Sequence, residues 1–292
     1  MEKYNLHRAY KQVGEFGRAQ KLIAFVTCMA RNANNYYYYP FAYLVLEQQF
    51  ECDTAGKGIF TPCSAEHICA SGMTNYRVYK SQEYFIQNWF VEMDLLCTAA
   101  PTIGLMLSVY FIGFALGGLA YSMPDRFGRK RCIFFGLSLS CFAQTVMLSS
   151  SNFGVRTFMF FLMGLAQIKN SLSYVWLSEC VSFRYKPTAF TMINIVDAVP
   201  MAVVCLSFLF LTKNWVWVCL LSTVLTYAAT ILTLYCPDSP RWHLVNGRTP
   251  EAIKALNQIA QMNGSEERIP SDAIFVEDPT NFTDRPPVAA TE

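Results

Sequence analysis

The dominant pattern of this chain is a series of long apolar segments separated by short polar ones. Six of these segments are each long enough to form a helix of roughly 20 residues, the length that crosses a bilayer. The pattern therefore predicts an all-α membrane protein in which six transmembrane helices form one bundle. The six predicted spans are 21–46, 99–123, 132–149, 155–177, 188–211 and 215–236.

The polar segments divide the rest of the chain into regions. A short amphipathic helix is predicted over 249–263, because Pro250 suits the first turn of a helix and Gly264 suits its end. The residues after it are polar and contain proline, which predicts an extended or disordered tail. The predicted regions are an N-terminal segment (1–20), the bundle (21–236) with a long loop (49–98), the amphipathic-helix region (237–264) and the tail (265–292).

Composition supports a membrane protein. Hydrophobic residues make up 53% of the chain and charged residues 15%, which is too apolar for an ordinary soluble domain. Lysine and arginine are in excess in the N-terminal segment and in the short loops, whereas the loop 49–98 is acidic. The positive-inside rule then places both termini inside and the acidic loop outside. The expected surroundings are a lipid bilayer and not a nucleic acid.

The acidic loop contains four cysteines. Four cysteines in one loop outside the membrane predict one or two disulfides in an oxidising compartment, with three full pairings left open. A metal site at Cys63, His67 and Cys69 is the alternative, but this spacing does not match a standard pair of zinc ligands, so no metal is predicted. The disulfide candidates are Cys52, Cys63, Cys69 and Cys97.

The loop contains no Asn-x-Ser/Thr triplet for glycosylation. Such triplets occur only at Asn263 and Asn281, on the predicted inside. A large cell-surface loop without an acceptor is unusual. The sequence therefore leaves two locations open, the mitochondrial inner membrane and the plasma membrane.

Three stretches carry recognisable motifs, and the second of them has two parts. GEFGR at 14–18 precedes the first span. NWFVEMDLLC at 88–97 and PDRFGRK at 124–130 flank the second span and form the second stretch, and PDSPRWHLVNGR at 237–248 follows the sixth. In this order they resemble the N-terminal half of the organic cation and anion transporters, a solute carrier family of the major facilitator superfamily. The resemblance implies one of two six-helix bundles that rock about a central substrate site.

The same resemblance implies a charged latch at the inner ends of the helices. Asp125 is expected to face a helix end of the partner bundle, and Arg126 and Arg129 to pair with acids such as Glu179. Gly128 permits the tight turn between two spans. The alternative is a solvated basic loop that only fixes topology. The predicted latch residues are Asp125, Arg126, Gly128, Arg129, Glu179 and Arg241, of which the last is also expected to pair with acids at helix ends.

Two positions depart from the superfamily pattern. Tyr121 stands where a glycine usually lets the second span pack closely against the other half. Phe160 stands where the superfamily favours an arginine, so a charge in the transport path is expected to be missing. Both departures favour a half-bundle that has adapted to another partner.

Several polar residues fall inside the predicted spans. A charge in mid-membrane costs several kcal/mol unless it is paired or hydrated, so each is a functional candidate. Either Arg31 and Lys169 face an anionic substrate, or Asp197 neutralises one of them in an internal ion pair. A partner protein or a lipid head group is a third way to satisfy these charges. The candidates are Arg31, Asn35, Lys169, Asn170 and Asp197.

Two functions remain in view. The first is an accessory or structural subunit within a larger assembly of membrane proteins. The second is transport of small organic ions, as a dimer of two copies or together with a separate second half, with flux lost on Arg31→Ala or Lys169→Ala. No nucleotide-binding loop, metal pair or nucleophile–base arrangement is present, so neither an enzyme nor a cofactor is predicted.

Overall fold

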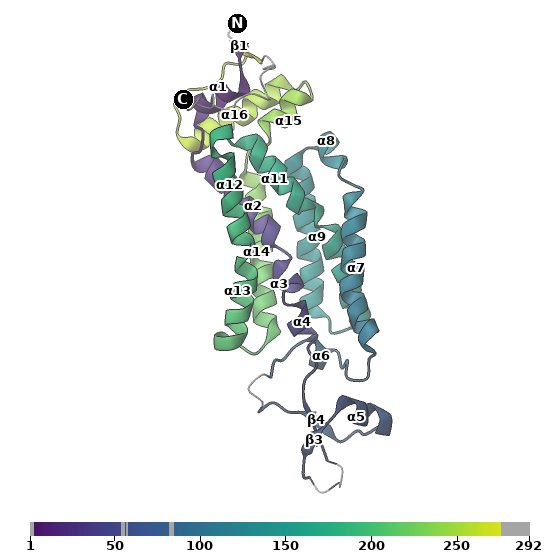
Figure 1. The fold of residues 1–292 in the computed structure, drawn as a ribbon. Helices are drawn as coiled ribbons and strands as arrows, with labels where there is room; N and C mark the ends of the chain where they lie inside the picture. Colours follow the sequence, from purple (N-terminus) through teal and green to yellow (C-terminus); the bar gives the residue numbers. More distant parts are fainter. Residues whose placement is uncertain (1–2, 54–55, 57, 82–84, 276–292) are drawn as a thin grey trace, which may run out of the picture.

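The computed structural model describes residues 3–53, 56, 58–81 and 85–275. It shows an elongated bundle of helices, with a small β-sheet module at one end and both ends of the described chain at the other (Figure 1). We call the end that carries α1, α15 and α16 the terminal end, and the opposite end the disulfide end. The chain is mostly helical, as the apolar pattern predicts.

Within the described residues, four helical stretches are long and apolar enough to cross a membrane. They correspond to the second, third, fifth and sixth predicted spans. The third stretch has a short irregularity, because Pro200 stands in the first turn of α13 and cannot continue the hydrogen bonding of α12. The four are α7 (Ala100–Gly118), α9 (Arg129–Ser149), the stretch Phe183–Leu211 and α14 (Trp215–Tyr235); within Phe183–Leu211 lie η1 (Phe183–Tyr185), α12 (Lys186–Asp197), α13 (Val199–Leu206) and the π-helical turn η2 (Ser207–Leu211).

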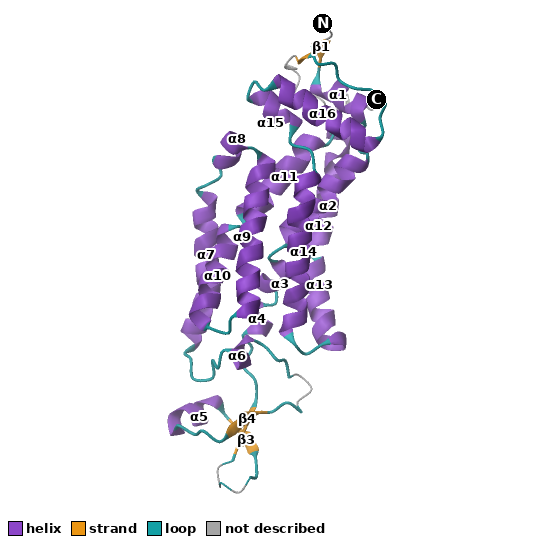
Figure 2. Ribbon diagram, turned by 180° about the vertical axis from the view of Figure 1, so that it is seen from behind, coloured by secondary structure: helices purple, strands orange, loops and turns teal. Residues whose placement is uncertain are grey.

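The other two predicted spans are interrupted helices. The first is broken after Asn32 and again at Pro40, and its three pieces follow one another from the terminal end towards the disulfide end (Figures 1 and 2). The fourth is broken at Ala166 and Gln167. None of the pieces reaches the length of a membrane-crossing helix by itself. The pieces are α2 (Arg18–Asn32), α3 (Asn35–Tyr38), α4 (Phe41–Leu44), α10 (Phe153–Leu165) and α11 (Ile168–Cys180).

Side chains satisfy the backbone groups that the breaks release. The Asn34 amide Nδ2 donates to the carbonyl of Met163, at 3.0 Å, and so joins the break in the first predicted span to the end of α10. A buried carbonyl needs a donor, and helix breaks within a membrane protein persist only where neighbours supply one. The Ala33 carbonyl accepts from Gln144 Nε2 (2.6 Å), Ser222 Oγ (2.8 Å) and Thr226 Oγ1 (3.3 Å).

Glycines allow α7 and α10 to pack with their backbones in contact. A Cβ atom on Gly164 would overlap the carbonyl oxygen of Tyr110, and one on Gly113 would overlap the carbonyl oxygen of Phe161. Small residues at such contacts are the usual way in which membrane helices approach closely.

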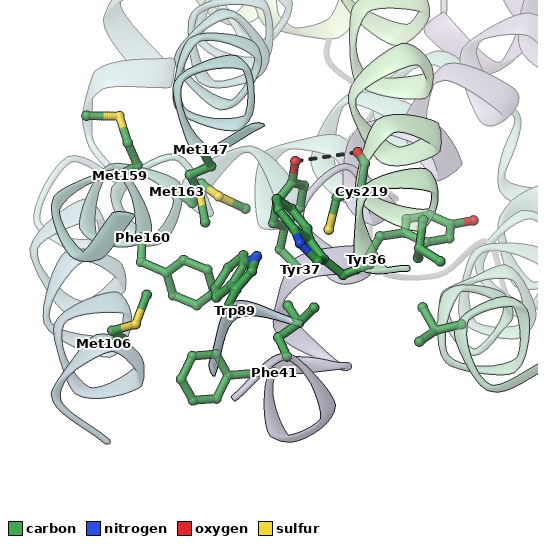
Figure 3. Packing of buried hydrophobic residues seen from close by; sticks show 14 of the residues in the cluster. Tyr36, Tyr37, Phe41, Trp89, Met106, Met147, Met159, Phe160, Met163 and Cys219 are labelled. Carbon is green, nitrogen blue, oxygen red and sulfur yellow. Dashed lines mark hydrogen bonds between the residues drawn. The ribbon is translucent and has the colours of Figure 1, made fainter. Parts of the chain in front are cut away.

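The core near the disulfide end is aromatic (Figure 3). Trp89 is fully buried, and its ring meets those of Phe160 and Trp215 edge to face, both at 5.6 Å between centroids. Such pairs add about 0.5–1.5 kcal/mol beyond the area they bury. Phe160, where the superfamily favours an arginine, is therefore a core residue and does not line an exposed path.

The loop between α4 and α7 folds into a small disulfide-bonded module. One disulfide, Cys52–Cys63, joins two adjacent strands, and the other, Cys69–Cys97, ties α5 to the segment that leads into α7. This is one of the three pairings that the sequence left open, and it leaves none of these four thiols for a metal ion. The antiparallel sheet has the order β3-β2-β4. Its elements are β2 (Phe50–Cys52), β3 (Thr61–Cys63), α5 (Ala65–Ser71), β4 (Tyr76–Val78) and α6 (Trp89–Glu92).

The terminal end is built from both ends of the described chain. The residues from Ser265 to Phe275 belong to the predicted tail, but they pack here, and Ile269 is only 2% exposed. The rest of the tail, 276–292, with Asn281, lies outside the described residues. The elements are β1 (Lys3–Tyr4), which pairs in parallel with β5 (Ile274–Phe275), and the helices α1 (Leu6–Val13), α8 (Met123–Phe127), α15 (Pro240–Val245) and α16 (Thr249–Asn263).

Candidate functional site

An ion pair joins two helix ends in the middle of the bundle. Arg31, in the last turn of α2, places Nε 3.1 Å from Oδ1 of Asp197, the last residue of α12. The two side chains are 21% and 24% exposed, so the pair is only partly buried. Of the two basic partners considered for Asp197, the structure selects Arg31.

Amide and aromatic groups surround this pair. Asn35 Nδ2 donates to Asp197 Oδ1 at 3.1 Å, and the Tyr39 hydroxyl donates to Oδ2 at 3.3 Å. The guanidinium of Arg31 lies over the ring of Tyr174, 4.7 Å from its centroid. We call these five residues the Arg31–Asp197 cluster. Tyr174 was not among the sequence candidates, because it comes from α11 and nothing in the local sequence connects it to α2.

The cluster offers groups for both signs of charge. A carboxylate oxygen of Asp197 and the ring faces of Tyr39 and Tyr174 can hold an organic cation. The guanidinium of Arg31 can hold a carboxylate through two hydrogen bonds.

Lys169 and Asn170 do not join the cluster. Lys169 is fully buried, and its Nζ donates to Oε1 of Gln167 at 3.2 Å. Gln167 in turn donates to the hydroxyl of Tyr110, in the core. The side-chain oxygen of Asn170 has no hydrogen-bond partner among the described residues. The polar candidates inside the predicted spans thus fall into two separate groups.

A second charged network lies at the terminal end, where the sequence predicts the latch. Arg129 bridges two acids: Nη1 lies 2.7 Å from Asp125 Oδ1, and Nη2 lies 3.3 Å from Glu179 Oε1. The other oxygen of Glu179 accepts from Ser239 Oγ at 2.6 Å. Gly128 has φ +95, and a Cβ there would meet the ring of Trp242 at 3.3 Å, so this turn requires glycine.

Arg126 and Arg241 stay outside this network. Both are exposed, and neither forms an ion pair within the described part of the chain. The expected partner, Glu179, is already occupied by Arg129 and Ser239. Tyr121 is also exposed, and its hydroxyl lies 3.1 Å from Ser171 Oγ, so the ring leans across α11.

An ion pair that contains a fully buried arginine was not among the sequence candidates. Arg156 is fully buried, and its Nη2 lies 2.6 Å from Oε1 of Glu92, whose side chain is 31% exposed. The guanidinium packs on the rings of both Trp89 and Trp215, at 5.2 and 4.8 Å from their centroids. Trp215 Nε1 donates to the other oxygen of Glu92 at 2.7 Å. This group connects α6, α10 and α14 at the disulfide end, and its aromatic surroundings indicate a structural role.

The family profile of the Major Facilitator Superfamily matches residues 22–275 of this chain. The chain belongs to that superfamily. The match includes the interrupted helices from residue 22 onwards as well as the four long apolar ones, and it confirms the resemblance to the superfamily. The first motif stretch, 14–18, lies before the matched residues.

Individual relatives agree with this assignment. The chain is 29% identical over 187 residues to rat "Organic cation/carnitine transporter 2", which covers 63% of this chain and 33% of the rat protein. It is 25% identical over 194 residues to mouse "Solute carrier family 22 member 2", covering 65% and 35%. It is 30% identical over 175 residues to "Organic cation/carnitine transporter 6" of Arabidopsis thaliana, covering 58% and 33%. The matches span about a third of the length of these relatives.

Proposed function

We propose that this chain forms one wall of a membrane path for small organic ions, and that the Arg31–Asp197 cluster holds the ion. The observation that carries the proposal is a partly exposed ion pair in mid-bundle, bordered by tyrosine rings. Charged groups at such depth in a membrane protein usually mark a substrate or ion pathway. Membership of a transporter superfamily supports the same role.

The ligand would exchange with the internal ion pair. An ammonium group takes the place of Arg31 on Asp197, and a carboxylate takes the place of Asp197 on Arg31. A zwitterion with both groups satisfies the two side chains together, so that neither charge is left buried without a partner. The names of the rat and Arabidopsis relatives mention organic cations and carnitine, and carnitine bears one charge of each sign.

The proposed topology has six spans. The interrupted helices α2–α4 and α10–α11 also cross the membrane, with their breaks near its middle, which is where superfamily members bind substrates. Six crossings put both termini on one side, assigned to the inside by the basic short loops. The disulfide module then faces the opposite, oxidising side. A second six-helix bundle supplies the other wall.

The latch network has a role in this scheme. Arg129 holds Asp125 and Glu179 within the chain, but the side chain of Asp125 is 72% exposed. Its carboxylate therefore remains accessible to a helix end of the complementary bundle. Arg126 and Arg241, also exposed, are available to acids of that bundle.

An accessory membrane subunit is the second candidate function. Two observations support it: Arg31 is already neutralised by Asp197, and the bulky Tyr121 occupies a position where close packing against a second bundle calls for a small residue.

Uptake by the purified chain in proteoliposomes distinguishes the two functions. The probes are tetraethylammonium, carnitine and benzoate, which represent a cation, a zwitterion and an anion. We expect saturable uptake of carnitine and of tetraethylammonium above that of protein-free liposomes. If no probe enters, and native mass spectrometry of the gently solubilised protein shows a stoichiometric membrane partner, the accessory role is the correct one.

A further inference from the structure

One side chain at the end of α16 fastens the bend between α1 and α2. Nδ2 of Asn263 donates to the carbonyls of Val13 and Gly14, at 2.9 and 3.3 Å, and to Oε1 of Gln20, at 3.1 Å. Its Oδ1 accepts from the backbone N–H of Ala19 at 2.9 Å. Both ends of the amide are therefore bonded to residues at the opposite end of the sequence. Because the Asn263 amide makes these hydrogen bonds, it is not free to act as an acceptor for glycosylation.

The bend is shaped to receive this amide. Gly14 has φ +98, and a Cβ on it would lie 2.9 Å from Nδ2 of Asn263. A Cβ on Gly17 would overlap the amide group itself. By contrast, a Cβ on Gly247 would meet nothing within 4 Å, although its φ is also positive. The two glycines of the GEFGR motif thus form a cradle for the Asn263 side chain.

Further contacts hold the N-terminal segment along α16. Ala9 and Val13 are fully buried against Leu256 and Ile259, which are also fully buried. The β1–β5 pairing and the hydrogen bond from Ser265 Oγ to the Gln12 carbonyl, at 3.2 Å, extend this contact along the segment.

The segment also reaches the latch network. The Tyr10 hydroxyl donates to the backbone carbonyl of Glu179, the acid that Arg129 and Ser239 hold by its carboxylate. Burial raises the pKa of Tyr10 well above its usual value, and the neighbouring Cys180 and Glu179 raise it further, so the hydroxyl stays a neutral donor.

The segment also contacts the turn that follows α11. Ser182 Oγ donates to Oε1 of Glu15 at 3.3 Å, and the ring of Phe16 stacks on that of Tyr185 at 5.2 Å. The segment therefore bridges α16 and the end of α11.

We propose that residues 3–17 form a strap, fastened by Asn263, which keeps the end of α11 closed and sets how readily the latch at Glu179 opens. With the strap in place, Cys180, the residue next to Glu179, is fully buried. Release of the strap exposes Cys180 locally, while the bundle core stays packed. The proposal goes beyond the transport role and does not depend on it, because the strap acts in any function that uses the latch.

Thiol labelling of the full chain in membranes tests the strap. N-ethylmaleimide is added, and the rate of modification is read at each cysteine by mass spectrometry of peptides. Because the Asn263 amide makes several hydrogen bonds, we expect Asn263→Ala to raise the rate at Cys180 about tenfold. Cys219, fully buried in the bundle core, serves as the internal reference and should keep its slow rate.

Asn246→Ala is the matched control. Asn246 also sits at the end of a short helix of the terminal end and donates to a backbone carbonyl, that of Trp242, at 2.9 Å. It does not touch residues 3–17, so its loss should leave the rate at Cys180 unchanged.

A double-mutant comparison shows whether the cradle itself matters. Gly17→Ala should raise the Cys180 rate on its own, because its methyl group displaces the amide. In the double variant Gly17→Ala/Asn263→Ala, Cys180 should be modified no faster than in Asn263→Ala alone. The added methyl group at position 17 then has no amide group to displace. If the Asn263→Ala protein fails to accumulate, Asn263→Asp takes its place in the single and the double variant. Asn263→Asp keeps the oxygen that accepts from Ala19 and removes the N–H donor.

Two results would contradict the proposal that residues 3–17 form a strap. One is an unchanged Cys180 rate in both single variants. The other is a rise at Cys219 equal to that at Cys180, which would mean that the whole bundle opens and that residues 3–17 have no local role.

Discussion

Replacing Glu92 with alanine is expected to lower the free energy of unfolding by about 3 kcal/mol, the lower end of the usual cost of removing one partner of a buried ion pair, because Arg156 is fully buried but the side chain of Glu92 is 31% exposed. The guanidinium of Arg156, fully buried, loses its only carboxylate among the described residues, and one of its nitrogens, Nη1, already has no hydrogen-bond partner there. The indole N–H of Trp215 loses its acceptor at the same time. Thermal unfolding of the purified chain in detergent measures the effect, as a fall in Tm of about 10 °C.

A second ion pair in the same chain provides the control. Glu51 and Arg77 join two strands of the disulfide module at 2.8 Å, but Arg77 is 60% exposed. Glu51→Ala should therefore cost no more than about 1 kcal/mol. Equal falls in Tm for the two variants would show that burial does not govern the Glu92–Arg156 pair, and would refute this part of the account.

Asp197→Asn is expected to reduce uptake of an organic cation or a zwitterion about 100-fold. The change removes the carboxylate proposed to hold the quaternary ammonium group, which has no N–H and is held by charge attraction alone. A 100-fold loss is about 2.7 kcal/mol, within the roughly 4 kcal/mol by which opposite charges about 4 Å apart attract at a partly exposed site. It also leaves Arg31 without its counter-charge. Initial uptake rates in proteoliposomes provide the measurement, with Tm recorded for each variant to separate loss of function from loss of fold.

Glu66→Gln is the control for this experiment. Glu66 is an exposed carboxylate in α5, far along the chain from the cluster, and its neutralisation should leave uptake unchanged. Lys169→Ala offers a further contrast, since Lys169 is buried outside the cluster. We expect it to lower uptake only in proportion to a fall in Tm. Wild-type uptake by a well-folded Asp197→Asn protein would remove Asp197 from the path.

The long apolar helices and α16 were predictable from local sequence. Their apolar residues recur over enough turns to define a span, and Pro250 and Gly264 mark the ends of α16. The break at Pro40 follows from proline itself, but the breaks after Asn32 and at Ala166 and Gln167 were not predicted. The first and fourth predicted spans are polar at these breaks (31–35 and 167–170), but those polar residues were interpreted as functional candidates within continuous helices. What stabilises the break at Ala33 is a set of donors from α9 and α14, far away in sequence.

The candidate site was predicted as a set of residues but not as an arrangement. The cost of a buried charge identified Arg31, Lys169 and Asp197, yet only the relative rotation of the helices decides which of the two cations meets Asp197. Glu92 and Arg156 were missed for a related reason. Both lie at helix ends near predicted loops, where charges are ordinary, and their burial depends on two tryptophans from different helices.

Equilibrium binding of labelled tetraethylammonium, carnitine and benzoate to the purified wild-type chain, Asp197→Asn and Arg31→Gln tests the central claim most directly. The account predicts a pattern that follows charge. Asp197→Asn should lose tetraethylammonium and weaken carnitine while keeping benzoate, and Arg31→Gln should lose benzoate and weaken carnitine while keeping tetraethylammonium. Binding of all three probes that is the same in the two variants as in the wild type would contradict it, because the ion would then be held somewhere other than the Arg31–Asp197 cluster.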